Sequence, residues 1–111
     1  MKSSMVENVL KKIGLPYVYY SWPEGAAPSL PYIVYYFPTG TSEAADNTVW
    51  HGQMSLNIEL YTPQRSAVDE AKVEKALAFY DLPFDRSETY LNDEHMYEVL
   101  YEMEVLADGT D

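Results

Sequence analysis

Cysteine is absent from this chain of 111 residues, and basic side chains are few. Without cysteine the protein can form no disulfide framework, thiolate nucleophile or zinc–thiolate site, which is typical of a reducing intracellular setting. Seven Lys and Arg residues stand against eighteen Asp and Glu residues, for a formal net charge of −11. Ten of the acidic residues lie in residues 81–111, where Arg86 is the only basic one. Such a segment repels phosphate, which argues against conventional binding of DNA or RNA.

Long apolar runs are also missing. No stretch approaches the roughly 20 apolar residues of a membrane span, and Met1 to Glu7 lack the uninterrupted apolar run of a signal peptide. The length is that of one domain, so we expect residues 1–111 to form a single domain with 1–2 and 107–111 frayed at its ends. These features together predict a soluble protein of the cytoplasm.

Motifs of catalysis and ligand binding are absent as well. The sequence contains no GxSxG, GxxxxGK[ST], GxGxxG or calcium-loop pattern. His51 and His95 lack the spaced ligand partners that a metal site requires. Glu102 and Glu104 would lie roughly 6.5–7 Å apart on a strand, as in an inverting glycosidase, but neighbouring carboxylates are common on solvated strands. We therefore predict no enzyme activity, no metal and no cofactor.

Tyrosine is abundant, with eleven residues that lie mostly in runs of strand-forming residues such as Tyr32–Tyr36. A tyrosine buries a broad ring while its hydroxyl group still finds a polar partner, so it suits strands that are half-buried or packed against another subunit. Trp22 and Trp50 have two readings: they cap the ends of the core, or they belong to an interface, where tryptophan is enriched.

Hydrophobic periodicity predicts the element order α-β-β-β-α-β-β. Helical spacing covers residues 3–13 and 66–80, the second helix with Ser66 as its N-cap. The strands are expected at residues 17–22, 32–37, 53–60, 84–91 and 95–106. Because hairpins dominate this order, we predict an α+β fold, with an antiparallel or mixed sheet of about five strands and two helices packed on one face.

Two strands alternate most clearly between inward and outward side chains. In the strand at 53–60 the apolar residues Met54, Leu56, Ile58 and Leu60 share one face. In the strand at 95–106 the inward side chains are those of Tyr97, Val99, Tyr101, Met103 and Val105. Glu98, Glu102 and Glu104 then share the outward face of the last strand. Between strands, residues 38–49 form a long loop rich in turn formers, and loops of this length are often functional or mobile.

Five segments, in this order and spacing, resemble a family of small proteins from tailed bacteriophages and prophages of Gram-positive hosts. The segments are Tyr32–Tyr35 after the loop Glu24–Pro31, then Ala45–Trp50, Ile58–Thr62, Glu88–Glu94 and Met96–Val105. The resemblance is to the tail completion, or tail terminator, proteins of long-tailed phages, and it spans roughly residues 13–106.

This resemblance implies a homohexameric ring, assembled in the host cytoplasm, that caps the tail tube and docks it to the capsid connector in the virion. DNA would pass through the ring without specific binding, and an acidic channel suits that passage because it does not hold phosphate. Glu98, Glu102 and Glu104 are then expected to face the lumen. The loop around residues 38–50 is expected to dock onto the tube or a neighbouring subunit. Its candidate residues are Thr39, Gly40, Asp46, Asn47 and Trp50.

Two alternatives remain at this point. A head-completion or adaptor ring at the same junction is similarly small, acidic and α+β. A small acidic inhibitor that imitates the DNA backbone needs closely spaced carboxylates over two or more faces. Here the charge is concentrated in the last third of the chain, which disfavours the inhibitor.

Overall fold

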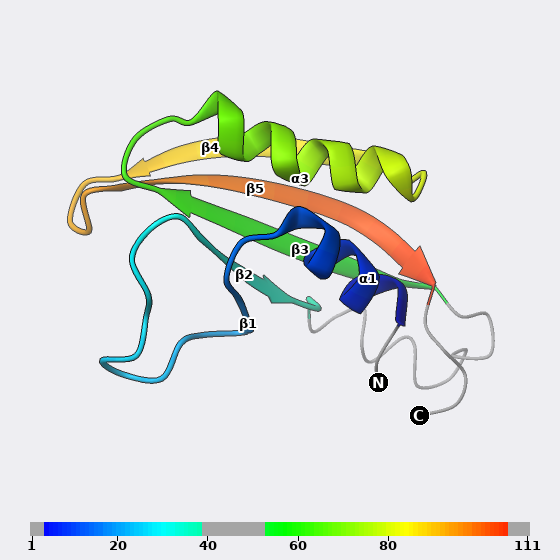
Figure 1. The fold of residues 1–111 in the computed structure, drawn as a ribbon, viewed down its shortest axis with the longest axis horizontal. Helices are drawn as coiled ribbons and strands as arrows, with labels where there is room; N and C mark the ends of the chain where they lie inside the picture. The colour runs from blue at the N-terminus through cyan, green and yellow to red at the C-terminus, as the bar shows by residue number, and fades with distance from the viewer. Residues whose placement is uncertain (1–3, 39–52, 107–111) are drawn as a thin grey trace.

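The computed structural model describes residues 4–38 and 53–106 and confirms the α+β fold and its predicted order. The elements are α1 (Ser4–Ile13), β1 (Tyr17–Tyr19), β2 (Tyr32–Tyr36), β3 (Gln53–Thr62), α3 (Ala67–Phe79), β4 (Phe84–Leu91) and β5 (Met96–Leu106). Figure 1 shows β3 and β5 as the two long strands of the sheet. Of the predicted loop at residues 38–50, only Pro38 is among the described residues. Residues 1–2 and 107–111, which we expected to fray, lie outside them. The first helix, predicted from residue 3, begins at Ser4.

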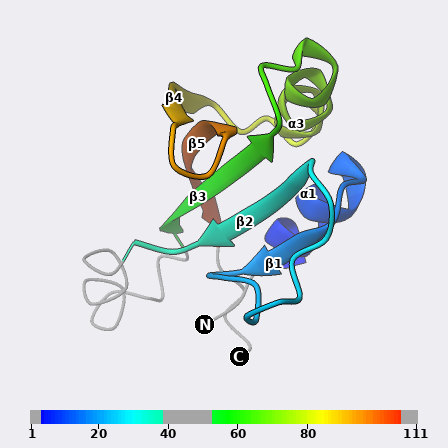
Figure 2. The same ribbon diagram turned by 90° about the vertical axis from the view of Figure 1, so that its left-hand side faces the viewer.

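The five strands form one mixed sheet in the order β1-β2-β3-β5-β4. β3 pairs antiparallel with β2 and β5, and β5 pairs antiparallel with β4, while β1 runs parallel to β2. The longest ladder joins β3 to β5, from Gln53 opposite Leu106 to Thr62 opposite Tyr97. Figure 2 shows α1 and α3 on the same side of this sheet, as predicted. The opposite side is called the open face below.

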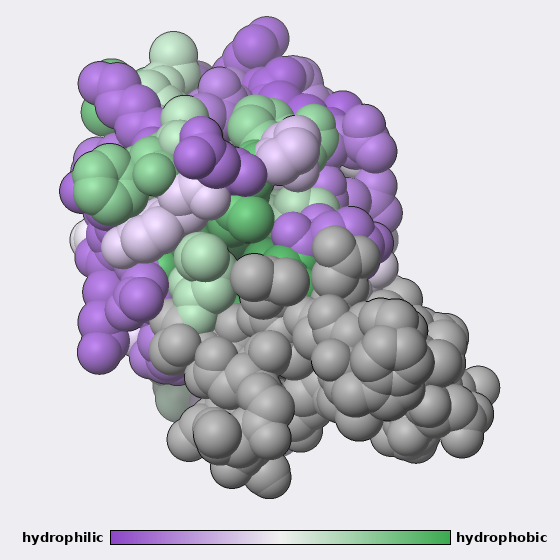
Figure 3. Space-filling view, turned by 90° about the vertical axis from the view of Figure 1, so that its right-hand side faces the viewer, coloured by the Kyte–Doolittle hydropathy of each residue, from purple (hydrophilic) through white to green (hydrophobic). Residues whose placement is uncertain are grey.

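The core lies between the two helices and the strands beneath them. Helical spacing places one apolar stripe of each helix on the sheet, and strand alternation supplies the facing side chains. The core residues that lie in helices and strands are Val6, Val9, Leu10 and Ile13 of α1, Val73, Ala76 and Leu77 of α3, Ile33 of β2, Met54, Leu56, Ile58 and Leu60 of β3, and Val99, Tyr101, Met103 and Val105 of β5, and Leu15 joins them from the segment after α1. Viewed from the end where β5 finishes, hydrophobic side chains gather between hydrophilic ones (Figure 3).

The predicted N-cap of the second helix is confirmed, and a glycine ends the first. Ser66 caps α3, and its hydroxyl group accepts a hydrogen bond from the Asp69 N–H at 3.2 Å. Gly14 follows α1 with φ +84°, a left-handed conformation that glycine adopts without steric cost.

β1 is shorter than the predicted strand at 17–22. Tyr20 turns out of the strand with φ +72°, and its N–H donates to the Tyr35 carbonyl group at 2.8 Å. Likewise β5 begins at Met96 rather than His95, because His95 has φ +53° in the turn before it. Both boundaries are therefore set by left-handed residues, which the strand propensity of the sequence does not reveal.

Candidate functional site

The open face of the sheet is the candidate site, because no described helix covers it. On β3 and β5 it carries the alternate residues that point away from the core. These are Ser55, Asn57, Glu59 and Tyr61 of β3 and Glu98, Leu100, Glu102 and Glu104 of β5. The prediction that Glu98, Glu102 and Glu104 share one face of their strand is confirmed by this register.

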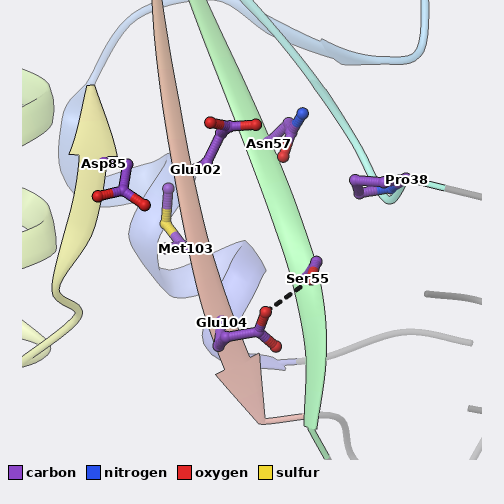
Figure 4. A pocket seen from close by; sticks show the side chains of 7 residues that line it. All are labelled: Pro38, Ser55, Asn57, Asp85, Glu102, Met103 and Glu104. Carbon is purple, nitrogen blue, oxygen red and sulfur yellow. Dashed lines mark hydrogen bonds between the residues drawn. The ribbon is translucent and has the colours of Figure 1, made fainter. Parts of the chain in front are cut away.

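One end of the open face is a shallow acidic pocket of about 240 Å³. Glu102 and Glu104 line it from β5, Asp85 from β4 and Ser55 from β3, and Figure 4 shows these side chains around the hollow. The Ser55 hydroxyl group donates to Glu104 Oε2 at 2.6 Å. Among the described residues that line it, none is a lysine, arginine or histidine.

Glu98 lies towards the other end of the open face and in a different environment. It is half-buried and sits opposite Tyr61, diagonal to Glu59 on the next strand. Burial, followed by the negative charge and the hydrogen bond of Glu59, raises the pKa of Glu98 to about 7. Glu59 also accepts a hydrogen bond from the Tyr61 hydroxyl group at 2.7 Å. Of the three predicted residues, only Glu102 and Glu104 are therefore exposed carboxylates.

A second hollow, of about 460 Å³, lies at this end of the open face. The loop over residues 20–27 forms one wall and the turn between β4 and β5 forms part of the other. Trp22 contacts Tyr32 edge-on with ring centroids 5.5 Å apart, and Tyr32 contacts Tyr61 at 5.6 Å. Trp22 therefore belongs to an aromatic cluster at the rim of the sheet. Trp50, the other tryptophan discussed from the sequence, lies outside the described residues.

The sequence reading missed an ion-pair cluster on the helix-covered side. Arg86 of β4 reaches Glu70 of α3 through Nη2 at 2.5 Å, Glu88 through Nη1 at 2.6 Å and Glu74 through Nε at 3.3 Å. Arg65 adds contacts of 3.7 Å to Glu70 and Glu88. A signal was present, because Arg86 is the only basic residue after position 80 and alternation places it on the inner face with Phe84.

Glu70 is the buried member of this ion-pair cluster. Its side chain is 8% exposed, so its charge depends on the guanidinium group of Arg86. Glu70 also lies in the first turn of α3, where the helix dipole favours a negative charge. The contacts of this cluster join α3 to β4.

The remaining predicted residues fall elsewhere. Thr39, Gly40, Asp46, Asn47 and Trp50 lie outside the described residues, as does His51. Within residues 4–38 and 53–106, no three acidic or histidine side chains are grouped to hold a metal ion. None of the helices in that same part of the chain is long and apolar enough to cross a membrane.

Comparison of the chain with protein-family models, with curated proteins and with solved structures gives no significant match. The resemblance to phage tail proteins therefore stays a prediction from the sequence.

Proposed function

We propose that this protein is a non-enzymatic structural protein of a long-tailed bacteriophage or prophage, and that it acts as the tail terminator. In this role it forms a homo-oligomeric ring at the head–tail junction, caps the tail tube and joins it to the capsid connector. The family resemblance over residues 13–106 suggests this role, and the acidic end of the open face is the observation that supports it most.

A ring through which DNA slides needs a lumen that does not bind phosphate. Glu102, Glu104 and Asp85 form a carboxylate surface without a basic residue in its lining, and such a surface repels the DNA backbone. Glu98 contributes less to this repulsion near neutral pH, because its raised pKa leaves it partly protonated. The lumen-facing surface is therefore proposed to centre on Glu102 and Glu104.

Ring closure needs two different patches on each subunit that fit one another head to tail. The sheet has two strands with one unpaired side each, β1 and β4, since they stand at the ends of the strand order. Exposed tyrosines lie along both of them, with Tyr19 52% and Tyr90 47% exposed. These edges are candidate subunit contacts, and charged residues such as Asp85 and Glu88 on β4 limit unspecific edge pairing.

A head-completion or adaptor ring shares these features and is the main alternative. A DNA-mimicking inhibitor fits less well, because it needs negative charge over several faces. Exposed lysines lie on both helices, at Lys11 and Lys12 of α1 and Lys72 and Lys75 of α3. The helices therefore carry positive as well as negative charge on their exposed sides.

The first test is the mass of the protein in solution, by light scattering over a concentration series with negative-stain images of the same fractions. Ring particles with the mass of six 12.7 kDa chains are expected. A monomer at every concentration, in the absence and presence of tail tubes, would contradict a ring.

The lumen assignment has its own test in phage particles. Changing Glu102 and Glu104 to lysine should slow DNA ejection, because the new charges hold phosphate. A matched control makes the same charge change at Glu7 and Asp93, two exposed residues away from the acidic pocket. Equal ejection rates in the two variants would show that Glu102 and Glu104 do not face the DNA.

A further inference from the structure

The groove between the 20–27 loop and the β4–β5 turn combines aromatic and acidic side chains. It has a volume of about 460 Å³ and lies over the end of the open face opposite to the acidic pocket. Four aromatic residues and three carboxylates dominate its lining, and none of its lining residues is basic. The aromatic residues are Tyr20, Trp22, Tyr32 and Tyr61, and the acidic residues are Glu24, Glu59 and Glu94.

The aromatic part of the groove is held in place from several directions. Trp22 and Tyr61 both pack on the ring of Tyr32, so the three rings form one connected wall. Tyr20 stands at the rim with 71% of its surface exposed and with φ +72°. A left-handed conformation is unfavourable for a bulky residue by roughly 1 kcal/mol or more, and strained residues of this kind cluster at binding sites.

The polar part of the groove lacks a counter-charge. Glu59 lines it, and burial and Glu59 raise the pKa of the neighbouring Glu98 to about 7, so Glu98 is about half protonated at neutral pH. A cation in such a site is attracted by the negative charge of the carboxylates and also by the quadrupole of the aromatic rings.

We propose that this groove binds an arginine side chain presented by a partner protein. A guanidinium group is planar, stacks on aromatic rings and forms paired hydrogen bonds to a carboxylate such as Glu59. A lysine ammonium group is a strongly hydrated point charge and uses a flat aromatic wall less well. Nucleic acid is repelled by the same carboxylates. This assignment does not depend on the ring described above, since a monomer carries the complete groove.

The test uses the full chain with Trp50 changed to Phe, so that Trp22 is its only tryptophan. Its fluorescence is followed at pH 8 during titration with acetyl-Gly-Arg-Gly-amide, and with peptides that carry citrulline or lysine instead. Citrulline keeps the shape of arginine without the charge. The arginine peptide is expected to bind at least about tenfold more tightly than the citrulline peptide, the size of a desolvated cation–aromatic contact.

Variants locate the binding. Glu59→Gln and Tyr20→Ala should each weaken binding of the arginine peptide several-fold, whereas Tyr90→Ala, which removes an exposed tyrosine outside the groove, should not. Circular dichroism of each variant reports that it is folded. Equal binding of the arginine and citrulline peptides would overturn the proposal, as would no response up to tens of millimolar. Equal binding of the lysine peptide would overturn the assignment to a guanidinium group.

Discussion

Two groups of carboxylates lie on opposite faces of the same sheet, and their surroundings differ. On the helix-covered side, Glu70, Glu74 and Glu88 surround the guanidinium group of Arg86, with Arg65 nearby. On the open face, Glu59 and Glu98 meet one another without any basic residue of the described chain in contact. The same type of side chain is thus neutralised on one face and left uncompensated on the other.

One carboxylate of each group has a shifted pKa, and the two shifts have opposite directions. A hydrogen bond from the Tyr97 hydroxyl group, together with the positive charges of Arg86 and Arg65, lowers the pKa of Glu88. Burial and the charge of Glu59 raise the pKa of Glu98 to about 7. The hydrogen bond from Tyr97 is therefore the main cause for Glu88, and burial is the main cause for Glu98. The first group is complete within the chain, whereas the second would gain from a cation supplied by another molecule.

Removing the guanidinium group of Arg86 from its ion-pair cluster should have the largest effect on stability. Arg86→Met leaves the buried Glu70 carboxylate with only the longer contact to the exposed Arg65, which should lower the free energy of unfolding by about 3 kcal/mol at pH 7. Denaturant unfolding measures it. Arg65→Met is the control: its side chain is 62% exposed, so the expected loss is below about 1 kcal/mol. Equal losses in the two variants would mean that Glu70 does not depend on Arg86.

Removing the charge of Glu98, which has no basic partner in the described chain, should stabilise the protein. The folded state holds the proton of Glu98 more tightly than the unfolded chain does, so stability falls as pH rises from about 4 to about 7. Glu98→Gln removes this loss and should raise the free energy of unfolding at pH 8 by about 1 kcal/mol, after allowance for solvent screening. At pH 4 the variant and the parent should be alike. Unfolding curves at the two pH values test this, and destabilisation at pH 8 would contradict it.

An arginine placed beside Glu98 should give Glu59 and Glu98 a counter-charge within the chain, as Arg86 does for Glu70. Thr89 of β4 lies directly opposite Glu98, and its side chain is on the open face. Thr89→Arg should stabilise the protein at pH 8 by about 0.5 kcal/mol through a cross-strand pair and should lower the pKa of Glu98. Titration of the Glu98 carboxyl resonance by NMR measures the shift, with Thr89→Gln as the uncharged control. An unchanged pKa in the arginine variant would show that the pair does not form.

Much of the fold was predictable because its signals are local. Alternation along residues 53–60 and 95–106 placed Met54 and Val99 in the core and Glu102 and Glu104 on the opposite face, since neighbours on a strand must point to opposite sides. The cap at Ser66 was equally local, because a hydroxyl group three residues before a free N–H suffices to form it.

Other features depended on contacts between distant residues. The parallel pairing of β1 with β2 follows from where the 20–31 connection returns, and the end of β1 follows from the left-handed Tyr20. The groove needs Trp22, Tyr61 and Glu94 from three separate segments, so no spacing in the sequence marks it.

The sequence alone determined that this protein is acidic, that its strands have one apolar face, and that Glu98, Glu102 and Glu104 share a side. Charge and period-two alternation are properties of neighbouring residues, and they survive in any fold that buries the apolar face. Only the tertiary structure decided which carboxylates have partners. Arg86 reaches Glu70 across sixteen positions of the chain, whereas Glu98 lies beside Glu59 with no such neighbour. The distance between charges in space, and not their order in the chain, sets their energies.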